Sequence, residues 1–214
     1  MDRALFDVLP APQRLALSYA PSAARAPTLA LLAVDARLGA ALRQRKEPLL
    51  VQMRLAWWRD TLRTEPRDWP AGEAVLELLR QWREPRGLVA LIDGWEGLLD
   101  ETLDAAASRV FAAGRGEAFA QLAREIGHDP HAADPCARLW ALGDLAANLS
   151  DPAERATVIE AAADLPRCPA LPRALRPLAV LAGLAHRSLA RGGTALLGGP
   201  GAMLYAMRVG ITGR

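Results

Sequence analysis

The chain has few of the residues that favour β-strands. Among its 214 residues there are four Ile, two Tyr and three Phe, compared with 44 Ala. β-branched and aromatic side chains favour strands, whereas Ala, Leu and Arg are strong helix formers. The composition therefore excludes an all-β fold, argues against a parallel sheet and predicts an all-α protein.

The chain also has no large excess of charge of one sign. It carries 26 basic and 24 acidic residues, which gives a formal net charge of +2. Binding to nucleic acid depends on a strong positive field, so no nucleic-acid partner is expected. With 51% hydrophobic and 23% charged residues, the chain is globular. Its length predicts one domain, residues 1–214.

Cysteines and long apolar runs are scarce. Cys136 and Cys168 are far apart and form no CxxC motif, a pattern typical of reduced thiols in the cytosol. The N-terminus lacks the apolar run of a signal peptide, and the longest charge-free run, residues 192–207, is interrupted by Gly and Pro. The sequence thus predicts free thiols, no transmembrane segment and a cytoplasmic location. Peripheral contact with the inner membrane stays open.

Pro and Gly divide the chain into helical segments. Pro stands near the start of several of them, and apolar residues recur every three or four positions within them. Residues 114–116, Gly-Arg-Gly, are expected to interrupt one long helix. The pattern predicts a single helical bundle. The expected helices span residues 27–45, 47–63, 73–82, 88–113, 117–126, 135–149, 152–163, 172–191 and 202–209.

Asp35 is the first candidate site residue. It lies on the same helical stripe as Leu31 and Leu38, so its carboxylate is expected to point inward. A buried carboxylate needs a cation, a metal or several hydrogen-bond donors. Arg54 and Arg59 on the next helix would supply a cation. Asp35 is therefore either half of a structural ion pair between two helices or an acid that lines a cavity.

Two consecutive tryptophans follow in the same helix as these arginines. Trp57 continues the apolar stripe of Leu50 and Met53 and is expected in the core. Trp58 lies further round the helix with Arg54, where an indole can stack on a guanidinium or line a cavity. Core packing is the main interpretation for both rings.

At this motif the sequence resembles the squalene/phytoene synthase family. More narrowly, it is similar to the divergent members that include the mitochondrial complex I assembly factors and their bacterial relatives. An inward Asp35 is followed by the double-Trp motif on the next helix, and further stretches agree along most of the chain. These are Arg54-Leu55-Ala56-Trp57-Trp58-Arg59-Asp60, Leu91-Ile92-Asp93-Gly94, Gly114-Arg115-Gly116-Glu117-Ala118-Phe119, Leu175-Arg176-Pro177-Leu178 and Arg208-Val209-Gly210-Ile211-Thr212-Gly213.

The resemblance implies an isoprenoid-synthase fold around a central cavity. Active members join two prenyl diphosphates, and two aspartate-rich helices hold the Mg²⁺ that neutralises the leaving diphosphate. This chain departs from that pattern, because Gly39 stands one helical turn after Asp35. By the resemblance, Asp35, Asp144 and Asp151 are candidate Mg²⁺ ligands. The candidate substrate-binding residues are Asp35, Arg54, Trp58, Arg59, Asp144 and Asn148.

Two further clusters have simpler interpretations. Glu96, Asp100 and Asp104 recur every four residues, with Asp93 one turn earlier, and could bind a cation, but a solvated helix face is favoured. The segment 128–131, His-Asp-Pro-His, could suggest zinc, but an exposed turn is favoured. No phosphate-binding glycine loop and no GxSxG nucleophile motif is present.

Three functions follow from these observations. The leading hypothesis is a non-catalytic or assembly-factor-like protein that holds a prenyl or lipid tail and contacts a protein partner. The alternative is an active Mg²⁺-dependent prenyltransferase that condenses two prenyl diphosphates. The third is a helical interaction module without a small ligand. Asp35 facing Asp144, Asn148 or Asp151 across an open pocket would favour the enzyme.

Overall fold

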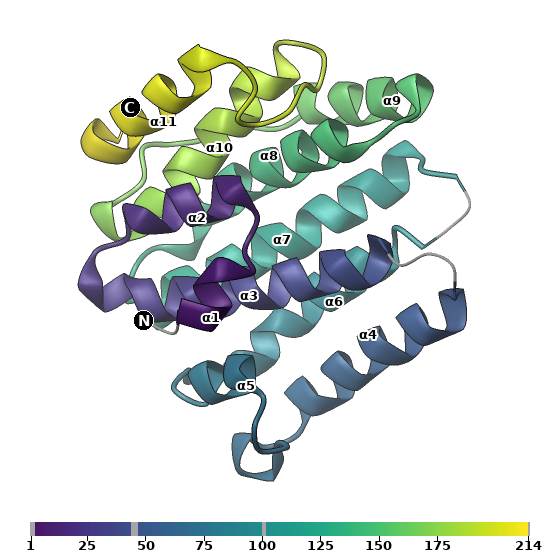
Figure 1. The fold of residues 1–214 in the computed structure, drawn as a ribbon, viewed down its shortest axis with the longest axis vertical. Helices are drawn as coiled ribbons and strands as arrows, with labels where there is room; N and C mark the ends of the chain where they lie inside the picture. The colour runs from purple at the N-terminus through teal and green to yellow at the C-terminus, as the bar shows by residue number, and fades with distance from the viewer. Residues whose placement is uncertain (1–2, 44–46, 100–101, 214) are drawn as a thin grey trace.

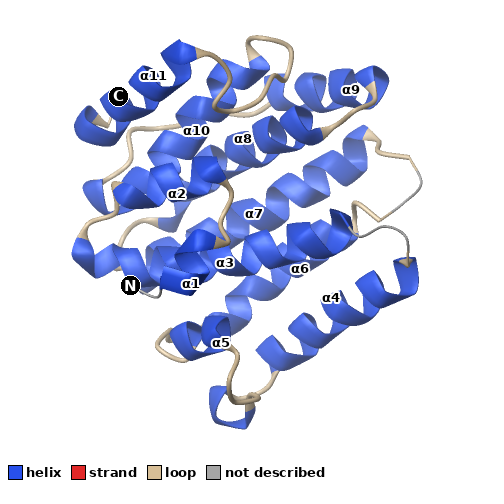
Figure 2. Ribbon diagram, in the orientation of Figure 1, coloured by secondary structure: helices blue, strands red, loops and turns tan. Residues whose placement is uncertain are grey.

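The computed structural model describes residues 3–43, 47–99 and 102–213. Within these ranges the secondary structure is helical, with three short 3-10 turns and no strand, which confirms the all-α prediction (Figure 2). No helix in this part of the chain is long and apolar enough to cross a membrane. The α-helices are α1 Arg3–Asp7, α2 Ala11–Ser18, α3 Ser22–Arg43, α4 Pro48–Arg63, α5 Ala74–Leu79, α6 Val89–Glu96, α7 Ala105–Glu125, α8 Pro130–Asn148, α9 Pro152–Ala163, α10 Arg176–Leu189 and α11 Pro200–Thr212.

Five helices form a series in which each packs on the next. In Figure 1, α6, α7, α8, α10 and α11 lie side by side across the molecule. Helix α3 packs against α5, α6 and α7, and α9 packs against α7 and α8. Helix α4 lies at one edge, in contact with α3 and α6 (Figure 1). The contact of α3 with α7 brings residues about 80 positions apart in the chain together, which matters for the site below.

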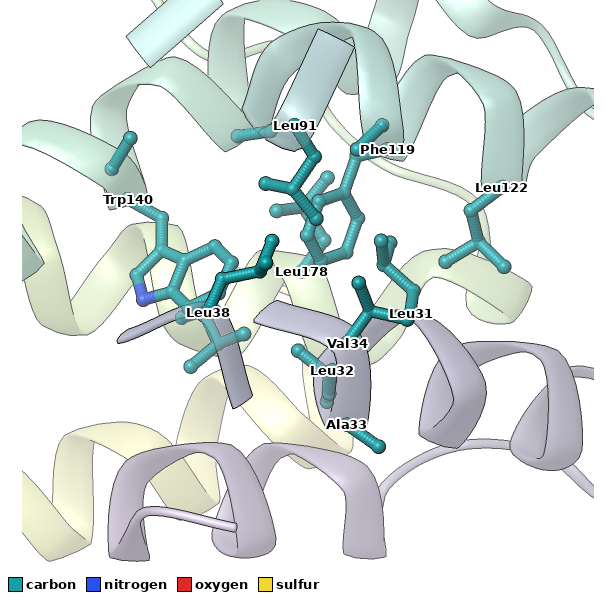
Figure 3. Packing of buried hydrophobic residues seen from close by; sticks show 14 of the residues in the cluster. Leu31, Leu32, Ala33, Val34, Leu38, Leu91, Phe119, Leu122, Trp140 and Leu178 are labelled. Carbon is teal, nitrogen blue, oxygen red and sulfur yellow. The ribbon is translucent and has the colours of Figure 1, made fainter. Parts of the chain in front are cut away.

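The core gathers apolar side chains from these helices (Figure 3). Leu31 and Leu38 of α3 are buried as the helical period predicts, and they lie among Phe119 of α7, Trp140 of α8 and Leu178 of α10. Burying a side chain of this size contributes about 1.5–3 kcal/mol. One side of α3 is thus fixed in the core, and Asp35 belongs to that same side.

The expected helix break at residues 114–116 is wrong. Helix α7 runs unbroken through this segment, and the break falls earlier, between α6 and α7. Gly114 lies against α6, where a Cβ atom would come within 3.0 Å of the Cα of Gly94. Two helices can approach this closely only without side chains at the contact, and that packing outweighs the roughly 1 kcal/mol cost of Gly in a helix. Asp104 instead marks the start of α7, since its carboxylate accepts a hydrogen bond of 2.7 Å from the Ala107 amide.

The buried face of α4 also differs from the expected one. Trp57 is 43% exposed, and its stripe neighbours Leu50 and Met53 are exposed as well. Trp58, by contrast, is only 6% exposed. The two rings contact each other edge to face. Both faces of this helix have apolar residues at helical spacing, so the period does not determine which one is buried. The face that packs in the core consists of Val51, Leu55, Trp58 and Leu62.

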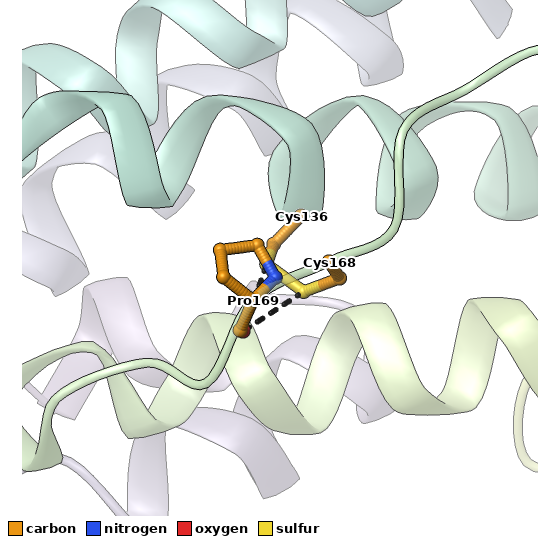
Figure 4. The surroundings of a disulfide bond; sticks show 3 residues. All are labelled: Cys136, Cys168 and Pro169. Atoms are coloured by element: carbon orange, nitrogen blue, oxygen red, sulfur yellow. Dashed lines mark hydrogen bonds between the residues drawn. A yellow bond between two sulfur atoms is a disulfide. The ribbon is translucent and has the colours of Figure 1, made fainter.

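The two cysteines form a disulfide, so the prediction of free thiols is wrong (Figure 4). Cys136 of α8 is bonded to Cys168, with 4.8 Å between their Cα atoms. They are 32 residues apart in sequence, but α9 packs back on α8 and returns the chain to it. Sequence spacing alone does not show this proximity. The expectation of a cytoplasmic location rested in part on free thiols, and it loses that support.

We expect the disulfide to contribute substantially to stability. Closing a loop of 32 residues removes denatured-state entropy worth about 3–4 kcal/mol. The variant Cys136→Ala/Cys168→Ala should therefore unfold with a free energy lower by about that amount. Urea denaturation of the oxidised protein, the protein in a thiol reductant and the variant measures this difference. Equal midpoints for all three would show that the two sulfurs are not bonded in solution.

Candidate functional site

A cavity of about 880 Å³ lies between α3, α7 and α8. Small-molecule sites usually have volumes of roughly 300–1,000 Å³, so this one is large enough for a ligand. Its walls are largely apolar, and its polar side chains come mainly from these three helices. The lining includes Asp35, Gly39, Leu42, Phe111, Arg115, Asp144, Leu145 and Asn148, together with residues at the start of α2 and after α10.

Arg115 forms the centre of this site. Its Nε and Nη2 donate to the two carboxylate oxygens of Asp35, each over 2.9 Å. Arg115 and Asp35 are each only 2% exposed. A two-point pairing between a guanidinium and a carboxylate fixes both groups in orientation as well as distance. The prediction that Asp35 points inward is therefore confirmed, and its partner lies on α7.

The same guanidinium also binds α8. Its Nη1 donates to Asp144 over 2.8 Å, so one side chain connects α3, α7 and α8. The amide of Asn148 donates to the backbone carbonyl of Asp144 over 2.8 Å, and more weakly to its carboxylate over 3.4 Å. Asp144 and Asn148 thus line the cavity as predicted, and both belong to this network.

Aromatic rings surround the guanidinium. Its central carbon lies 4.1 Å from the ring centroid of Trp140, 4.7 Å from that of Phe111 and 5.2 Å from that of Trp95. Aromatic faces attract cations, and the attraction grows when water is excluded. The Nε1–H of Trp95 also donates to Asp35 over 2.9 Å. The rings therefore stabilise the charge of Arg115 and help to hold its carboxylate partner.

Asp35 is held in its ionised form by its neighbours. Burial raises the pKa of the Asp35 carboxyl above its usual value, while the charge of Arg115 acts in the opposite direction. Gln13, Trp95 and Arg115 together donate four hydrogen bonds to its two oxygens. An ionised carboxylate accepts hydrogen bonds at both oxygens, whereas a protonated carboxyl group would have to donate one. Because donors surround both oxygens, they favour the ionised form. We conclude that Asp35 and Arg115 form a charged pair at neutral pH.

The predicted partners of Asp35 on α4 are wrong. Helix α4 contributes none of the described residues that line the cavity, so Arg54, Trp58 and Arg59 lie outside this lining. Arg59 binds Glu96 and Asp93 of α6, the latter over 2.8 Å. The helix that follows α3 in the sequence was expected to supply the cation that pairs with Asp35. In the fold, however, α3 packs against α7, and α7 supplies this cation.

The carboxylates do not fit a divalent-metal centre. Asp35 and Asp144 do not meet across open space, because Arg115 binds both, so each carboxylate is already paired with a guanidinium. Asp151, the third predicted ligand, begins α9, where it accepts a hydrogen bond of 2.7 Å from the amide of Ala153. Among the residues described here, no three His, Cys, Asp or Glu side chains are grouped as metal ligands.

The remaining predicted clusters have structural roles. Asp93 and Glu96 lie on α6 and bind Arg59, whereas Asp104 begins α7, so these acids do not share one helix as expected. Asp100 lies outside the described residues. Asp129, between His128 and His131, accepts a hydrogen bond of 2.9 Å from the amide of His131 and begins α8.

Sequence reasoning missed three members of the site: Arg115, Trp95 and Gln13. The interpretation of residues 114–116 as a helix break concealed Arg115. A usable signal was present, because Phe111, Arg115 and Phe119 recur every four residues and so share one face of a helix. An arginine flanked by buried aromatic residues on one stripe points inward.

We expect the substitution Asp35→Ala to destabilise the protein by about 3–5 kcal/mol, because it leaves the buried Arg115 with one carboxylate partner. The matched control Asp93→Ala removes a carboxylate whose side chain is 51% exposed and should cost less than about 1 kcal/mol. Urea denaturation of both variants at neutral pH gives the comparison. Similar losses for the two would mean that Asp35 and Arg115 do not depend on each other.

Comparison with protein-family models, with curated protein sequences and with solved structures gives no match.

Proposed function

We propose that this protein binds a prenyl or similar lipid tail in the cavity and does not ionise a prenyl diphosphate. In this proposal it is a divergent, non-catalytic member of the squalene/phytoene synthase family, with a bundle of the isoprenoid-synthase type. The observation that carries the proposal is the position of Arg115, whose guanidinium lies between the carboxylates of Asp35 and Asp144. The assembly-factor-like role and the protein partner stay predictions.

The apolar walls support the binding of a tail. Aliphatic side chains from several separate segments line the cavity and can contact a hydrocarbon chain. Each buried CH₂ group of such a chain contributes about 0.8 kcal/mol. The aliphatic lining residues are Leu42, Leu98, Leu103, Leu145, Leu149, Leu196 and Leu197.

The charged groups argue against catalysis. Ionisation of an allylic diphosphate needs cations that stabilise the leaving group as its charge develops. Among the described residues the buried cation is Arg115, and it is already paired with both Asp35 and Asp144. The alternative, a Mg²⁺-dependent prenyltransferase, requires these two carboxylates to release the guanidinium and bind metal instead. That exchange would leave a buried guanidinium without a partner, which is costly.

The proposal is tested by two measurements on the purified protein. With farnesyl or geranylgeranyl diphosphate, diphosphate release should stay at the background rate over a Mg²⁺ titration. Equilibrium dialysis with radiolabelled farnesol should show saturable binding at one site. Ala147→Phe places a ring in the cavity wall and should abolish this binding, whereas Ala106→Phe, on an exposed position of α7, should leave it unchanged.

Two results would contradict the proposal. One is Mg²⁺-dependent turnover that disappears in both Asp35→Asn and Asp144→Asn, which would assign these carboxylates to a metal centre. The other is farnesol binding that Ala147→Phe and Ala106→Phe affect equally, which would place the lipid outside the cavity.

A further inference from the structure

We infer that the ligand of this cavity is a long-chain alcohol of the isoprenoid type, with an uncharged head group that donates a hydrogen bond, rather than a diphosphate. The inference rests on the lipid binding proposed above and specifies the head group. It follows from the charge of the polar end of the cavity and from the hydrogen-bonding capacity that remains there.

Among the described residues that line the cavity, acidic side chains outnumber basic ones by one. Asp35, Arg115 and Asp144 together sum to −1, because one guanidinium faces two carboxylates. Glu154 and Arg43 also line the cavity and cancel each other. A diphosphate head placed here would meet a negative site, and repulsion between like charges is strong where water is partly excluded. An uncharged head avoids this cost.

At this end of the cavity, the carboxylate of Asp144 keeps acceptor sites that its protein donors do not use. Gln13 lines the cavity and is 4% exposed; its amide nitrogen donates to Asp35 over 3.2 Å. Its Oε1 has no hydrogen-bond partner, but this atom is fully buried and is not accessible from the cavity. Asp144 accepts one short bond from Arg115 and one long bond of 3.4 Å from Asn148, although a carboxylate has about four lone-pair sites.

A ligand hydroxyl can donate a hydrogen bond to these unused acceptor sites, whereas an ionised diphosphate cannot. A ligand hydroxyl can donate to the Asp144 carboxylate, which lines the cavity and whose side chain is 24% exposed. An ionised diphosphate presents acceptors, which cannot form a hydrogen bond with the carboxylate of Asp144. Together with the aliphatic walls, these groups select an alcohol with a long hydrocarbon tail.

The inference is tested by equilibrium dialysis of the wild-type protein with three radiolabelled probes that share one tail: farnesol, its methyl ether and farnesyl diphosphate. Farnesol should bind more tightly than the diphosphate by about tenfold or more, with or without Mg²⁺. The methyl ether has no donor and should bind about fivefold more weakly than farnesol.

A charge variant tests the cause of the preference. Asp144→Asn removes one negative charge from the polar end while Arg115 keeps its two-point pairing with Asp35. This change should tighten the binding of farnesyl diphosphate and reduce the preference for farnesol. Asp60→Asn makes the same change on an exposed position of α4, outside the cavity lining, and should leave the preference as it is.

The possible failures are distinguishable. Farnesyl diphosphate binding as tightly as farnesol at the cavity would overturn the inference about the head group and leave the proposed lipid binding intact. Equal affinities for farnesol and its methyl ether would overturn the role of the hydroxyl. Binding of none of the three probes would overturn the proposed function itself.

Discussion

Placing a guanidinium in the interior of a helical bundle costs free energy, because it removes the charge from water. The surroundings of Arg115 offset this desolvation cost. Two carboxylates bind it, and three aromatic rings face it. Desolvation of a charge costs several kcal/mol, and a buried pair repays this only with well-aligned hydrogen bonds. The alignment in turn requires α3, α7 and α8 to meet at fixed positions. This one interaction therefore links the three helices that supply most of the charged groups in the cavity lining.

The same interaction distinguishes this cavity from one that works through metal ions. Metal ions enter with a substrate diphosphate and supply positive charge where the leaving group departs. A guanidinium fixed to α7 cannot move in this way, and its charge is already balanced by Asp35 and Asp144. A cavity with apolar walls and a closed set of ion pairs is suited to holding a ligand. This is why we propose binding rather than turnover.

The sequence predicted those features that depend on local pattern. Composition indicated an all-α protein, and the helical period placed Leu31, Asp35 and Leu38 on the buried side of α3. The spacing of Asp144 and Asn148 also placed them together on α8, where they line the cavity. In these cases the relevant neighbours lie within one or two helical turns, so the local sequence pattern is sufficient to predict which residues share a face.

Features that depend on distant contacts were not predictable in this way. The partner of Asp35 is 80 residues further along the chain, and the partner of Cys136 is reached only after α9 turns back on α8. The glycine at position 114 indicated a helix break by propensity, but close packing against Gly94 explains it. Helix α4 has two apolar faces, and its packing against α6 determines which of them is buried.

The most direct test of the account is the pH dependence of stability in Arg115→Met, compared with Arg115→Met/Asp35→Asn. Burial raises the pKa of Asp35, and Arg115 opposes that rise. Without Arg115 the folded-state pKa should rise further above the unfolded value, so the folded chain binds the extra proton. Stability should then be highest at low pH and fall as pH rises through the folded-state pKa, by up to ~1.4 kcal/mol per pH unit.

The variant Arg115→Met should therefore unfold more easily at pH 8 than at pH 5, and the added Asp35→Asn should remove that difference. Urea denaturation across this pH range measures both. The same pH profile for the single and the double variant would show that Arg115 does not balance the charge of Asp35, and would contradict the account of the site.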